Sequence, residues 1–454
     1  MLINFRFSNF MSFEKLNEFS LVRGKSKKHT SHLYENKSLD ISTLKFSAIY
    51  GANGAGKSNF VKVFKFVQEL IVLNKFESSH RDLYCRTHTI NKDQSSDFEF
   101  ELLLNDKIYS YGFSVNLHKK VFLREWLYDI SNNNEIEYFT YNNSLNELNI
   151  ALPLDNSELS TRFRIYKDDY LNLKNTKKSL FLHFINSSKS EFKSQDNKGI
   201  HLEVLNSLYD WFQNNLEVIL PNKAPKRALI YLGNSEVSDI TNFLMDFGTG
   251  IKKVSKEPAN LDEIYKMDDK NFIDYIIEEA TEKFINSKKI TYKGIARTNK
   301  NLYALHTSKN SNDEIKTEWF IFKFSLNNNT KYSLGELSDG TIRLLELYSV
   351  LTNKNNKTFI VDEIDRSLHP NLTLNFLKYY LSKNTSTQLI ATTHEDRILD
   401  LDILRRDEIW FVERDEDDCS QLYSLEKFKI RFDQDVMKAY LDGRYGSVPK
   451  FKFF

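Results

Sequence analysis

Near-alternating apolar and polar positions open the chain and return in its first third. The opening run of apolar residues consists of Leu2, Ile3, Phe5, Phe7 and Phe10. This spacing predicts a half-buried β-strand. Residues 97–141 repeat the alternation in several runs, which short polar segments separate. We therefore predict three or more antiparallel strands there, joined as a meander.

Helical spacing begins after residue 58. Apolar residues recur at steps of three and four over 60–71, which predicts an amphipathic helix. A short apolar strand is predicted immediately upstream, at Leu44–Tyr50. A glycine-rich turn therefore joins a strand directly to a helix.

Helical patterns also dominate between about residues 155 and 300. One helix is predicted over 240–247, with Ser238 as its N-cap and Gly248 as its stop. A second helix is predicted over 272–284. This stretch carries no catalytic motif that we can name. It is either an insertion that only packs on the rest of the protein, or a segment that docks a partner or regulates the site.

Strands and helices alternate in the last third of the chain. We predict strands at 317–326, 358–362 and 388–392, one helix within 333–351, and another from about Pro370. The strands at 358–362 and 388–392 are both followed by polar residues that could take part in catalysis or ligand binding.

Composition narrows the class of protein. A chain of 454 residues favours two domains, or one domain with a large insertion. With 63 basic and 62 acidic residues, no large basic face defines the protein, although a local nucleic-acid groove remains open. The two cysteines, Cys85 and Cys419, lack the spacing of a zinc site. The N-terminus does not have the pattern of a signal peptide, and no apolar run is long enough to span a membrane, so we expect a cytoplasmic protein.

The glycine-rich turn fits the pattern G-x-x-x-x-G-K-[ST] at Gly51–Ser58. Its glycines allow backbone N–H groups to point at phosphate oxygens, and the following helix adds the positive end of its dipole. Lys57 would bind the β- and γ-phosphates, and the Ser58 hydroxyl would bind Mg²⁺. We expect ATP to contact the following residues: Asn53, Gly54, Ala55, Gly56, Lys57, Ser58 and Asn59.

An acid pair ends the apolar strand at 358–362. Beside a phosphate-binding loop, Asp362 would hold Mg²⁺ and Glu363 would act as general base on the attacking water. His394 follows the next apolar strand. A single histidine in such a place is either structural or a contact for the γ-phosphate or the attacking water.

A further string lies just upstream of the acid-tipped strand, at Leu337–Arg343, and contains Ser338, Asp339 and Gly340. The serine could donate its hydroxyl, the glycine permits close backbone approach, and the helix start adds its dipole for a γ-phosphate. Ser-Asp-Gly is also usual in plain turns, so its position before the acidic strand gives the string its weight.

The glycine-rich loop, the string at 337–343, the acid pair and His394 follow one another along the chain in this order. Together they resemble the ATPase heads of the ABC type in their SMC/RecF branch. The opening Ile3–Phe13 looks like the first strand of that branch. The strings Asp362–Pro370 and Tyr440–Pro449 resemble more closely the AAA-family ATPases of bacterial anti-phage defence loci, which include abortive-infection, Rlo-type, PARIS-type and OLD-like proteins. In such proteins the string at 337–343 is the signature segment and His394 the switch histidine.

The resemblance implies an α/β fold, an ABC-type head with a mixed-sheet P-loop core, an antiparallel β lobe and a mainly helical insertion. The expected division is 1–154 for the N-terminal lobe, 155–316 for the insertion and 317–454 for the C-terminal lobe. The resemblance covers the insertion only loosely. No glutamine of the Q-loop is evident, and Asn186 is its nearest candidate.

Two further features of the sequence distinguish the chain from transporter ATPases and from OLD nucleases. His369 stands where transporter ATPases usually carry an aspartate, which argues against transport. Only 60 residues follow His394, too few for the Toprim nuclease domain of OLD proteins. The acidic run Asp415–Asp418 is interpreted as a solvated hairpin turn.

The resemblance also implies partners. Each copy would carry half a site, so that ATP and Mg²⁺ join two copies head to tail as a homodimer or a larger even oligomer. The leading hypothesis is a regulator in phage defence that controls a separate toxin or nuclease and responds to DNA or a phage protein. The alternatives are a RecF-like DNA-maintenance ATPase, and a scaffold that holds nucleotide and stores a partner.

Overall fold

The computed structural model describes residues 1–132, 134–151, 157–173, 179–187, 200–221, 235–287, 290–309, 314–327, 330–353, 356–383, 385–429 and 435–448. The chain forms two compact units. The first contains Met1–Val218, Lys354–Ile364 and Leu381–Phe454, and the second contains Ile219–Asn353 and Asp365–Tyr380. This division differs from the three expected segments, because the signature segment shares its unit with much of the insertion. The predicted boundary at 154/155 lies outside the described residues.

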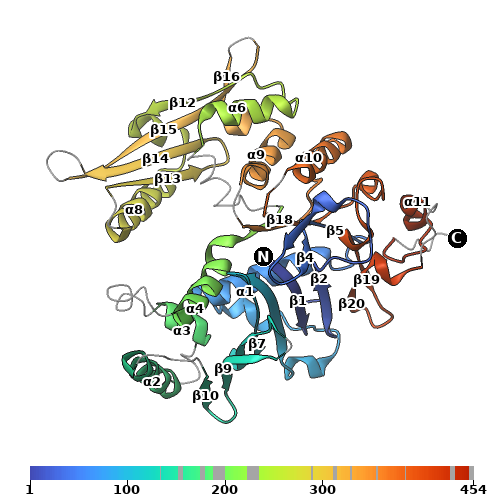
Figure 1. Cartoon of the computed structure of the whole chain (residues 1–454). Coiled ribbons are helices and arrows are strands. Elements are labelled where there is room, and N and C mark those ends of the chain that lie inside the picture. Colours follow the sequence, from blue (N-terminus) through green and yellow to red (C-terminus); the bar gives the residue numbers. More distant parts are fainter. Residues whose placement is uncertain are drawn as a thin grey trace. The chain divides into compact units, whose positions relative to one another are not determined.

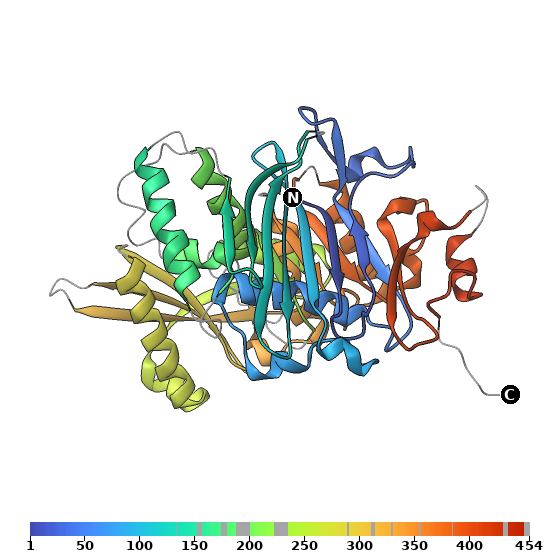
Figure 2. The same cartoon turned by 90° about the horizontal axis from the view of Figure 1, so that it is seen from below.

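An antiparallel sheet of seven strands forms one layer of the first unit (Figure 2). Its strands, in spatial order, are β10 (Glu147–Ile150), β9 (Ile136–Asn142), β8 (Val121–Asp129), β7 (Lys107–Asn116), β6 (Ser96–Leu104), β1 (Leu2–Ser8) and β2 (Asn17–Ser20). The predicted opening strand and the predicted meander are both confirmed. Alternation decides the two faces, since Phe5 and Phe7 are buried whereas Arg6 between them is half-buried.

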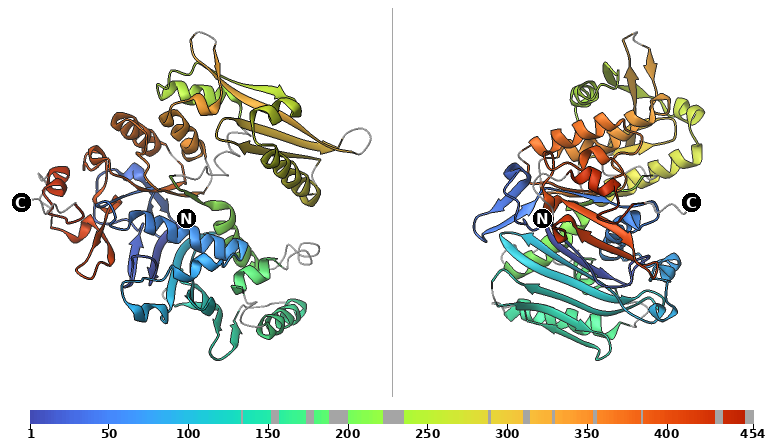
Figure 3. Two further views of the ribbon diagram at one scale, coloured as in Figure 1. Left: turned by 180° about the vertical axis from the view of Figure 1, so that it is seen from behind. Right: turned by 90° about the vertical axis from the view of Figure 1, so that its right-hand side faces the viewer.

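Helix α1 (Lys57–Leu73) packs on the buried face of this sheet (Figures 1 and 3). The rings of Phe5, Phe64 and Phe100 form one cluster, with centroid distances of 4.5 Å from Phe5 to Phe64, 4.4 Å from Phe5 to Phe100 and 6.0 Å from Phe64 to Phe100. Phe60 continues the contact toward Phe19, at 5.2 Å. Aromatic rings bury large apolar areas, so this cluster fixes the helix against the lobe.

A mixed sheet of six strands forms the second layer of the first unit. Its strands, in spatial order, are β11 (Leu216–Ile219), β17 (Thr358–Val361), β18 (Gln388–Thr392), β5 (Phe46–Tyr50), β19 (Ile409–Arg414) and β20 (Ser420–Ser424). From β17 to β19 neighbouring strands are parallel, and β20 returns antiparallel as a hairpin. Strands β17, β18 and β5 are buried along their whole length, as expected of parallel strands covered on both faces.

Smaller elements complete the first unit. They are β3 (Leu33–Asn36), β4 (Ile41–Leu44), α2 (Ser157–Asn172), α3 (Phe181–Ser187), α4 (Ile200–Asp210), the π-helix η6 (Trp211–Asn215) and α11 (Val436–Leu441). Short 3-10 helices occur at η1 (Thr30–His32), η2 (Ser78–Asp82), η3 (Thr89–Lys92), η8 (Asp396–Ile398), η9 (Arg406–Glu408) and η10 (Leu425–Lys427). Among the described helices, none combines the length and the apolar character needed to cross a membrane.

The second unit contains an antiparallel sheet that the sequence did not lead us to expect in full (Figure 1). Its strands are β12 (Lys253–Ala259), β15 (Ile315–Ser325), β14 (Leu302–Lys309) and β13 (Thr291–Arg297), and β16 (Lys331–Tyr332) pairs with β15. Only the strand near 317–326 was predicted. The other strands carry lysines, one proline and one glycine, so their apolar alternation is weak and cross-strand pairing decides their structure.

The second unit also contains helices. They are α6 (Val237–Asp246), α7 (Leu261–Met267), α8 (Lys270–Ser287), the 3-10 helix η7 (Leu334–Glu336), α9 (Asp339–Thr352) and α10 (Pro370–Ser382). Of these helices, α6 and α8 pack on the sheet of this unit. Ser238 is not an N-cap, because α6 begins one residue earlier and Glu236 occupies that position. Gly248 does adopt a left-handed conformation, with φ of 65°, just beyond the helix end, as predicted.

Candidate nucleotide site

The glycine-rich turn joins β5 to α1 in the first unit, and two of its glycines are fixed by close contacts. A Cβ at Gly51 would overlap Val412 O of the neighbouring strand β19. A Cβ at Gly56 would come 2.9 Å from Ser12 Oγ and closer still to Ser420 Oγ, and φ at this residue is 120°. The loop therefore requires glycine at Gly56 for both space and backbone conformation.

Lys57 begins α1 and folds back over the loop. Its Nζ atom donates hydrogen bonds to Gly51 O at 2.6 Å and to Ala52 O at 3.1 Å. The side chain is buried, whereas Asn53 and Gly54 at the tip of the loop are exposed. The first-turn amides of α1, where positive potential is concentrated, follow directly after this loop.

Four polar side chains support the loop, and three of them, Ser12, Arg414 and Ser420, were not predicted as site residues. Ser420 Oγ on β20 lies 2.5 Å from Ala55 O and 2.7 Å from Ser12 Oγ. Asn59 Nδ2, on α1, donates to the same Ser12 Oγ at 2.9 Å. Arg414 Nε donates to Gly54 O at 2.9 Å. No local motif indicates Arg414 or Ser420, because the pairing of β19 with β5 and of β20 with β19 brings them to the loop.

The register of the parallel strands brings the acid pair to the same edge of the sheet. Strands β17, β18 and β5 are consecutive neighbours, so their carboxyl ends carry Asp362, Thr392 and Gly51 side by side. Ligands of open α/β sheets bind at this edge. Loop and acid pair therefore lie at one end of one sheet.

Thr392 links the two acidic residues. Its hydroxyl donates to Asp362 Oδ1 at 2.7 Å and accepts a hydrogen bond from the backbone N–H of Glu363, also at 2.7 Å. Asp362 is buried, and Glu363 is half-buried with φ of 49°. A left-handed conformation is costly for a residue with a Cβ, so the surroundings hold Glu363 in place. The backbone N–H of Ile364 then donates to Thr392 O at 3.0 Å, which closes the turn.

His394 lies two residues beyond the end of β18 and is exposed. The preceding residue is anchored, because Thr393 N donates to Ile49 O at 3.1 Å. The loop, the acid pair and the histidine, all predicted from the sequence, thus belong to the carboxyl edge of one sheet. The Ser58 hydroxyl and the Asp362 carboxylate supply the oxygen ligands that Mg²⁺ prefers, so these residues fit such an ion.

The C-terminal string at 440–448 packs beneath the loop. The ring of Tyr440 on α11 stacks on Phe411 of β19 at 5.6 Å and meets the ring of Tyr50 at 5.8 Å. Burial raises the pKa of Tyr440 to about 12, so it stays a neutral hydroxyl. This string therefore packs against Tyr50 at the carboxyl end of β5 and against Phe411 within β19. Pro449 lies outside the described residues.

The signature segment belongs to the second unit. Ser338 caps α9, accepting a hydrogen bond from Thr341 N at 3.2 Å, and Asp339 is the first residue of the helix. Both residues are exposed. A Cβ at Gly340 would come 2.8 Å from Ser367 O, so glycine permits this close backbone approach. The predicted helix start is therefore present at this string, and the Ser338 side chain caps it.

Two secondary predictions have structural counterparts. Asn186 is buried on α3, and its Nδ2 donates to Leu182 O of the same helix at 2.7 Å. Its assignment to a Q-loop stays a prediction. The acidic run begins the turn of the β19–β20 hairpin, where Asp415 Oδ1 accepts from Asp417 N at 3.1 Å and from Cys419 N at 2.9 Å. The predicted hairpin turn is confirmed.

Comparison with known proteins agrees with a nucleotide site on the six-stranded mixed sheet. Residues 46–400 match a family model described as "AAA domain, putative AbiEii toxin, Type IV TA system". No curated protein matches the chain.

Several solved structures are similar over most of the chain. An SmcHead bound to the C-winged helix domain of ScpA has 12% identity and a TM-score of 0.42, covering 93% of this chain and 97% of that one. The SMC head domain from Thermotoga maritima has 11% identity and a TM-score of 0.37, covering 94% and 99%. An Smc head domain with an extended coiled coil, bound to the C-terminal domain of ScpA from Pyrococcus furiosus, has 14% identity and a TM-score of 0.37, covering 98% and 99%.

Proposed function

Because the chain belongs to this AAA-domain family, we propose that it binds ATP with Mg²⁺ at the carboxyl edge of the mixed sheet and hydrolyses it. One observation carries the proposal: β17, β18 and β5 are parallel neighbours, and their ends bear the acid pair, the histidine and the phosphate loop. These are the parts that phosphoryl transfer to water needs.

The residues of this edge would divide the work. The loop amides and Lys57 bind the triphosphate, and Ser58 and Asp362 hold the metal ion. Mg²⁺, when bound, neutralises charge on the phosphate oxygens. Glu363 takes a proton from the attacking water, and His394 orients that water or the γ-phosphate. The two hydrogen bonds of the Thr392 hydroxyl hold the Asp362 carboxylate and the backbone of Glu363 in fixed positions relative to each other.

A sister molecule would complete the site. We propose a head-to-tail homodimer, or a larger even oligomer, in which Ser338, Asp339 and Gly340 of one copy meet the triphosphate held by the other. The exposed, capped start of α9 supports this, because a helix N-terminus favours an anion. ATP would then shift the population toward the closed dimer by binding that state more tightly.

The biological role that fits best is regulation of a separate effector in anti-phage defence. The family description mentions a putative AbiEii toxin and a type IV toxin–antitoxin system, which supports a toxin–antitoxin context for this role. DNA or a phage protein would act as the trigger. Purification with the product of a neighbouring gene, with and without ATP, tests this role. Strong, salt-sensitive stimulation of hydrolysis by DNA without a partner would instead favour DNA maintenance.

Glu363→Gln tests the mechanism most directly. Glutamine keeps the size of the side chain and the Cβ at the same backbone conformation, but it cannot accept the proton of water. We expect this variant to bind ATP, to hydrolyse it at least about 100-fold more slowly, and to accumulate as a dimer. Phosphate release and light scattering, each with and without ATP, measure both effects.

The matched control is Lys57→Ala, which should lose ATP binding in calorimetry and stay monomeric with ATP. Normal phosphate release by Glu363→Gln would remove Glu363 from its role. Unchanged ATP affinity of Lys57→Ala would refute the nucleotide site itself.

A further inference from the structure

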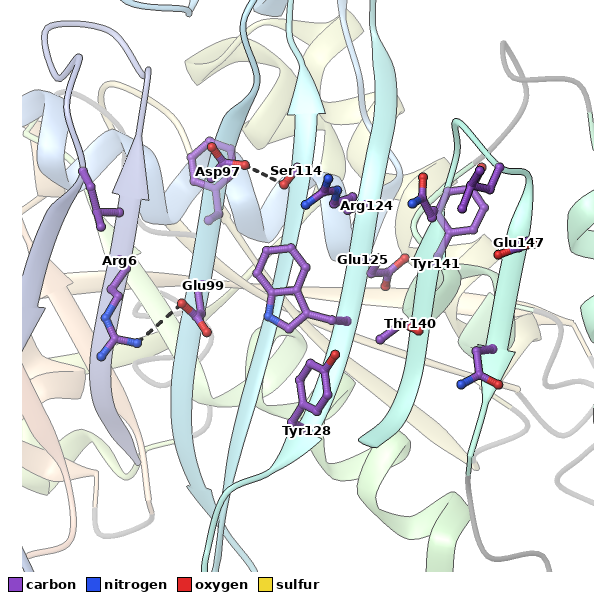
Figure 4. A pocket seen from close by; sticks show the side chains of 16 residues that line it. Arg6, Asp97, Glu99, Ser114, Arg124, Glu125, Tyr128, Thr140, Tyr141 and Glu147 are labelled. Carbon is purple, nitrogen blue, oxygen red and sulfur yellow. Dashed lines mark hydrogen bonds and ion pairs between the residues drawn. The ribbon is translucent and has the colours of Figure 1, made fainter. Parts of the chain in front are cut away.

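The solvent-facing side of the seven-stranded sheet is hollowed around β8 (Figure 4). The hollow has a volume of about 620 Å³. Outward-facing side chains of β8 point into it, namely Arg124, Trp126 and Tyr128. Thr140 flanks them on the adjacent strand β9, and Glu99 lies on β6, on the other side of β7. None of these residues belongs to the proposed nucleotide site. The sheet face therefore offers a second place where a ligand fits.

A glycine fixes the tryptophan at the centre of the hollow. Gly112 on β7 is the cross-strand neighbour of Trp126 on β8. A Cβ at Gly112 would come 2.6 Å from Trp126 Cε2 and closer still to Cζ2, so the indole lies flat against β7. The same register places Glu99 opposite Gly112 on the far side. A half-buried indole face thus lies one strand away from a carboxylate.

The charges on this face are mostly negative. Among the described residues, six acids point outward from the sheet and two bases accompany them: Glu18, Asp97, Glu99, Glu101, Glu137 and Glu147, with Arg6 and Arg124. Arg6 is already paired with three of these acids, at 2.7 Å from Glu101, 2.9 Å from Glu18 and 3.5 Å from Glu99, and Glu99 also accepts a hydrogen bond from Ser110 Oγ at 2.7 Å. The face therefore keeps an acidic surplus around its aromatic centre, which attracts cations and repels nucleic acid.

We propose that this face docks a basic segment of a partner protein, with a lysine or arginine side chain laid on the indole of Trp126 and its charge directed toward Glu99. A cation over an aromatic face gains from the ring quadrupole, and a neighbouring carboxylate adds a charge-assisted hydrogen bond. Exposed Leu16 and Leu145, at 66% and 63% exposure, border the hollow and offer apolar contact for the stem of the segment.

This inference goes beyond the proposed ATP hydrolysis and does not depend on it. Binding of the basic segment should be the same in Lys57→Ala, which keeps the sheet face intact. A failure of the docking face and a failure of the nucleotide site are thereby separate results.

A labelled decapeptide of alternating arginine and glycine is the probe, and its fluorescence anisotropy with the full chain at low salt measures affinity. We expect Trp126→Ala to weaken binding about fivefold and Glu99→Gln about threefold. Arg124→Gln should instead strengthen binding by about twofold, because it removes a competing positive charge. The double change Asp417→Asn with Asp418→Asn, in the β19–β20 turn and outside the lining of the hollow, is the control for non-specific attraction and should change nothing.

Circular dichroism establishes that each variant is folded, and Arg124→Gln provides a gain of binding that misfolding cannot imitate. Two kinds of result would overturn the proposal. One is equal binding of the arginine peptide by wild type, Trp126→Ala and Arg124→Gln. The other is equal or tighter binding of a matched glutamate–glycine peptide or of a single-stranded oligonucleotide.

A second readout comes from the tryptophans. All four lie in described segments, and Trp211, Trp319 and Trp410 are buried. The arginine peptide should therefore protect Trp126 from quenching by acrylamide. Undiminished quenching at saturating peptide would place the bound peptide elsewhere and contradict the assignment.

Discussion

At the scale of single residues, the candidate site depends on a threonine that has no place in any motif. Thr392 joins Asp362 to the backbone of Glu363 through one hydroxyl, at 2.7 Å on each side. Glu363 has a left-handed backbone conformation, and a strained residue keeps such a conformation only when its surroundings hold it. The Thr392 hydroxyl is one of the groups that hold it, through its hydrogen bond with Glu363 N. Such supporting groups often matter nearly as much as the groups that touch the ligand.

Thr392→Val should therefore impair hydrolysis while the fold survives. Valine has the same shape but neither donates to Asp362 nor accepts from Glu363. We expect the rate of phosphate release to fall about 10- to 100-fold, with ATP affinity reduced less. Thr392→Ser keeps the hydroxyl and is the matched control, with near-normal hydrolysis. Equal rates in the valine and serine variants would show that the hydroxyl has no role.

At the scale of elements, one buried carboxylate connects the β lobe to a helix. Glu125 on β8 accepts hydrogen bonds from Leu182 N at 3.0 Å, from Phe181 N and from Tyr111 OH at 3.0 Å. It thereby satisfies the first amides of α3, which have no partner within the helix. Burial raises the pKa of Glu125 from its usual 4.5 to about 7, against the opposing effect of these hydrogen bonds.

The shifted pKa predicts a specific pH dependence of stability. Between pH 4.5 and 7 the folded chain holds a proton on Glu125 that the unfolded chain has lost, so stability falls as pH rises through this window. The shift corresponds to roughly 3 kcal/mol. Glu125→Gln has no titratable group at this position. The free energy of unfolding of wild type minus that of the variant should therefore decrease from pH 5 to pH 7.5 in urea titrations. A difference that stays constant with pH would contradict the assignment.

At the scale of the whole molecule, the proposed dimer would build each nucleotide site from two copies. The loop and acid pair belong to the first unit, and Ser338–Gly340 to the second. In a head-to-tail dimer each site takes its loop from one copy and its capped helix from the other. Two variants that are inactive alone should therefore complement each other.

Mixing Lys57→Ala with Ser338→Asp tests this arrangement. Aspartate still caps α9, but it places a negative charge opposite the phosphates. Half of the dimers in an equal mixture contain both variants, and one of their two sites is intact, so the mixture should recover about a quarter of wild-type hydrolysis. Each variant alone should be inactive. No recovery after confirmed subunit exchange would exclude a head-to-tail site.

The sequence determined those features that local spacing encodes. The alternation of Phe5 and Phe7 predicted β1, and the meander was evident in the same way. The loop Gly51–Ser58 required a strand before it and a helix after it, and both are present. These predictions succeeded because side-chain periodicity and glycine conformation are properties of neighbouring residues.

Only the tertiary structure decided which distant residues meet. Strand pairing over long separations in the chain brought Ser420, Arg414 and Thr392 to the loop and the acid pair, and it laid Trp126 over Gly112. Strands β12, β13 and β14 were not predicted for the same reason, because pairing with their neighbouring strands stabilises them and their own apolar pattern is weak. Local periodicity is written in the sequence, whereas register between strands is a cooperative property of the folded chain.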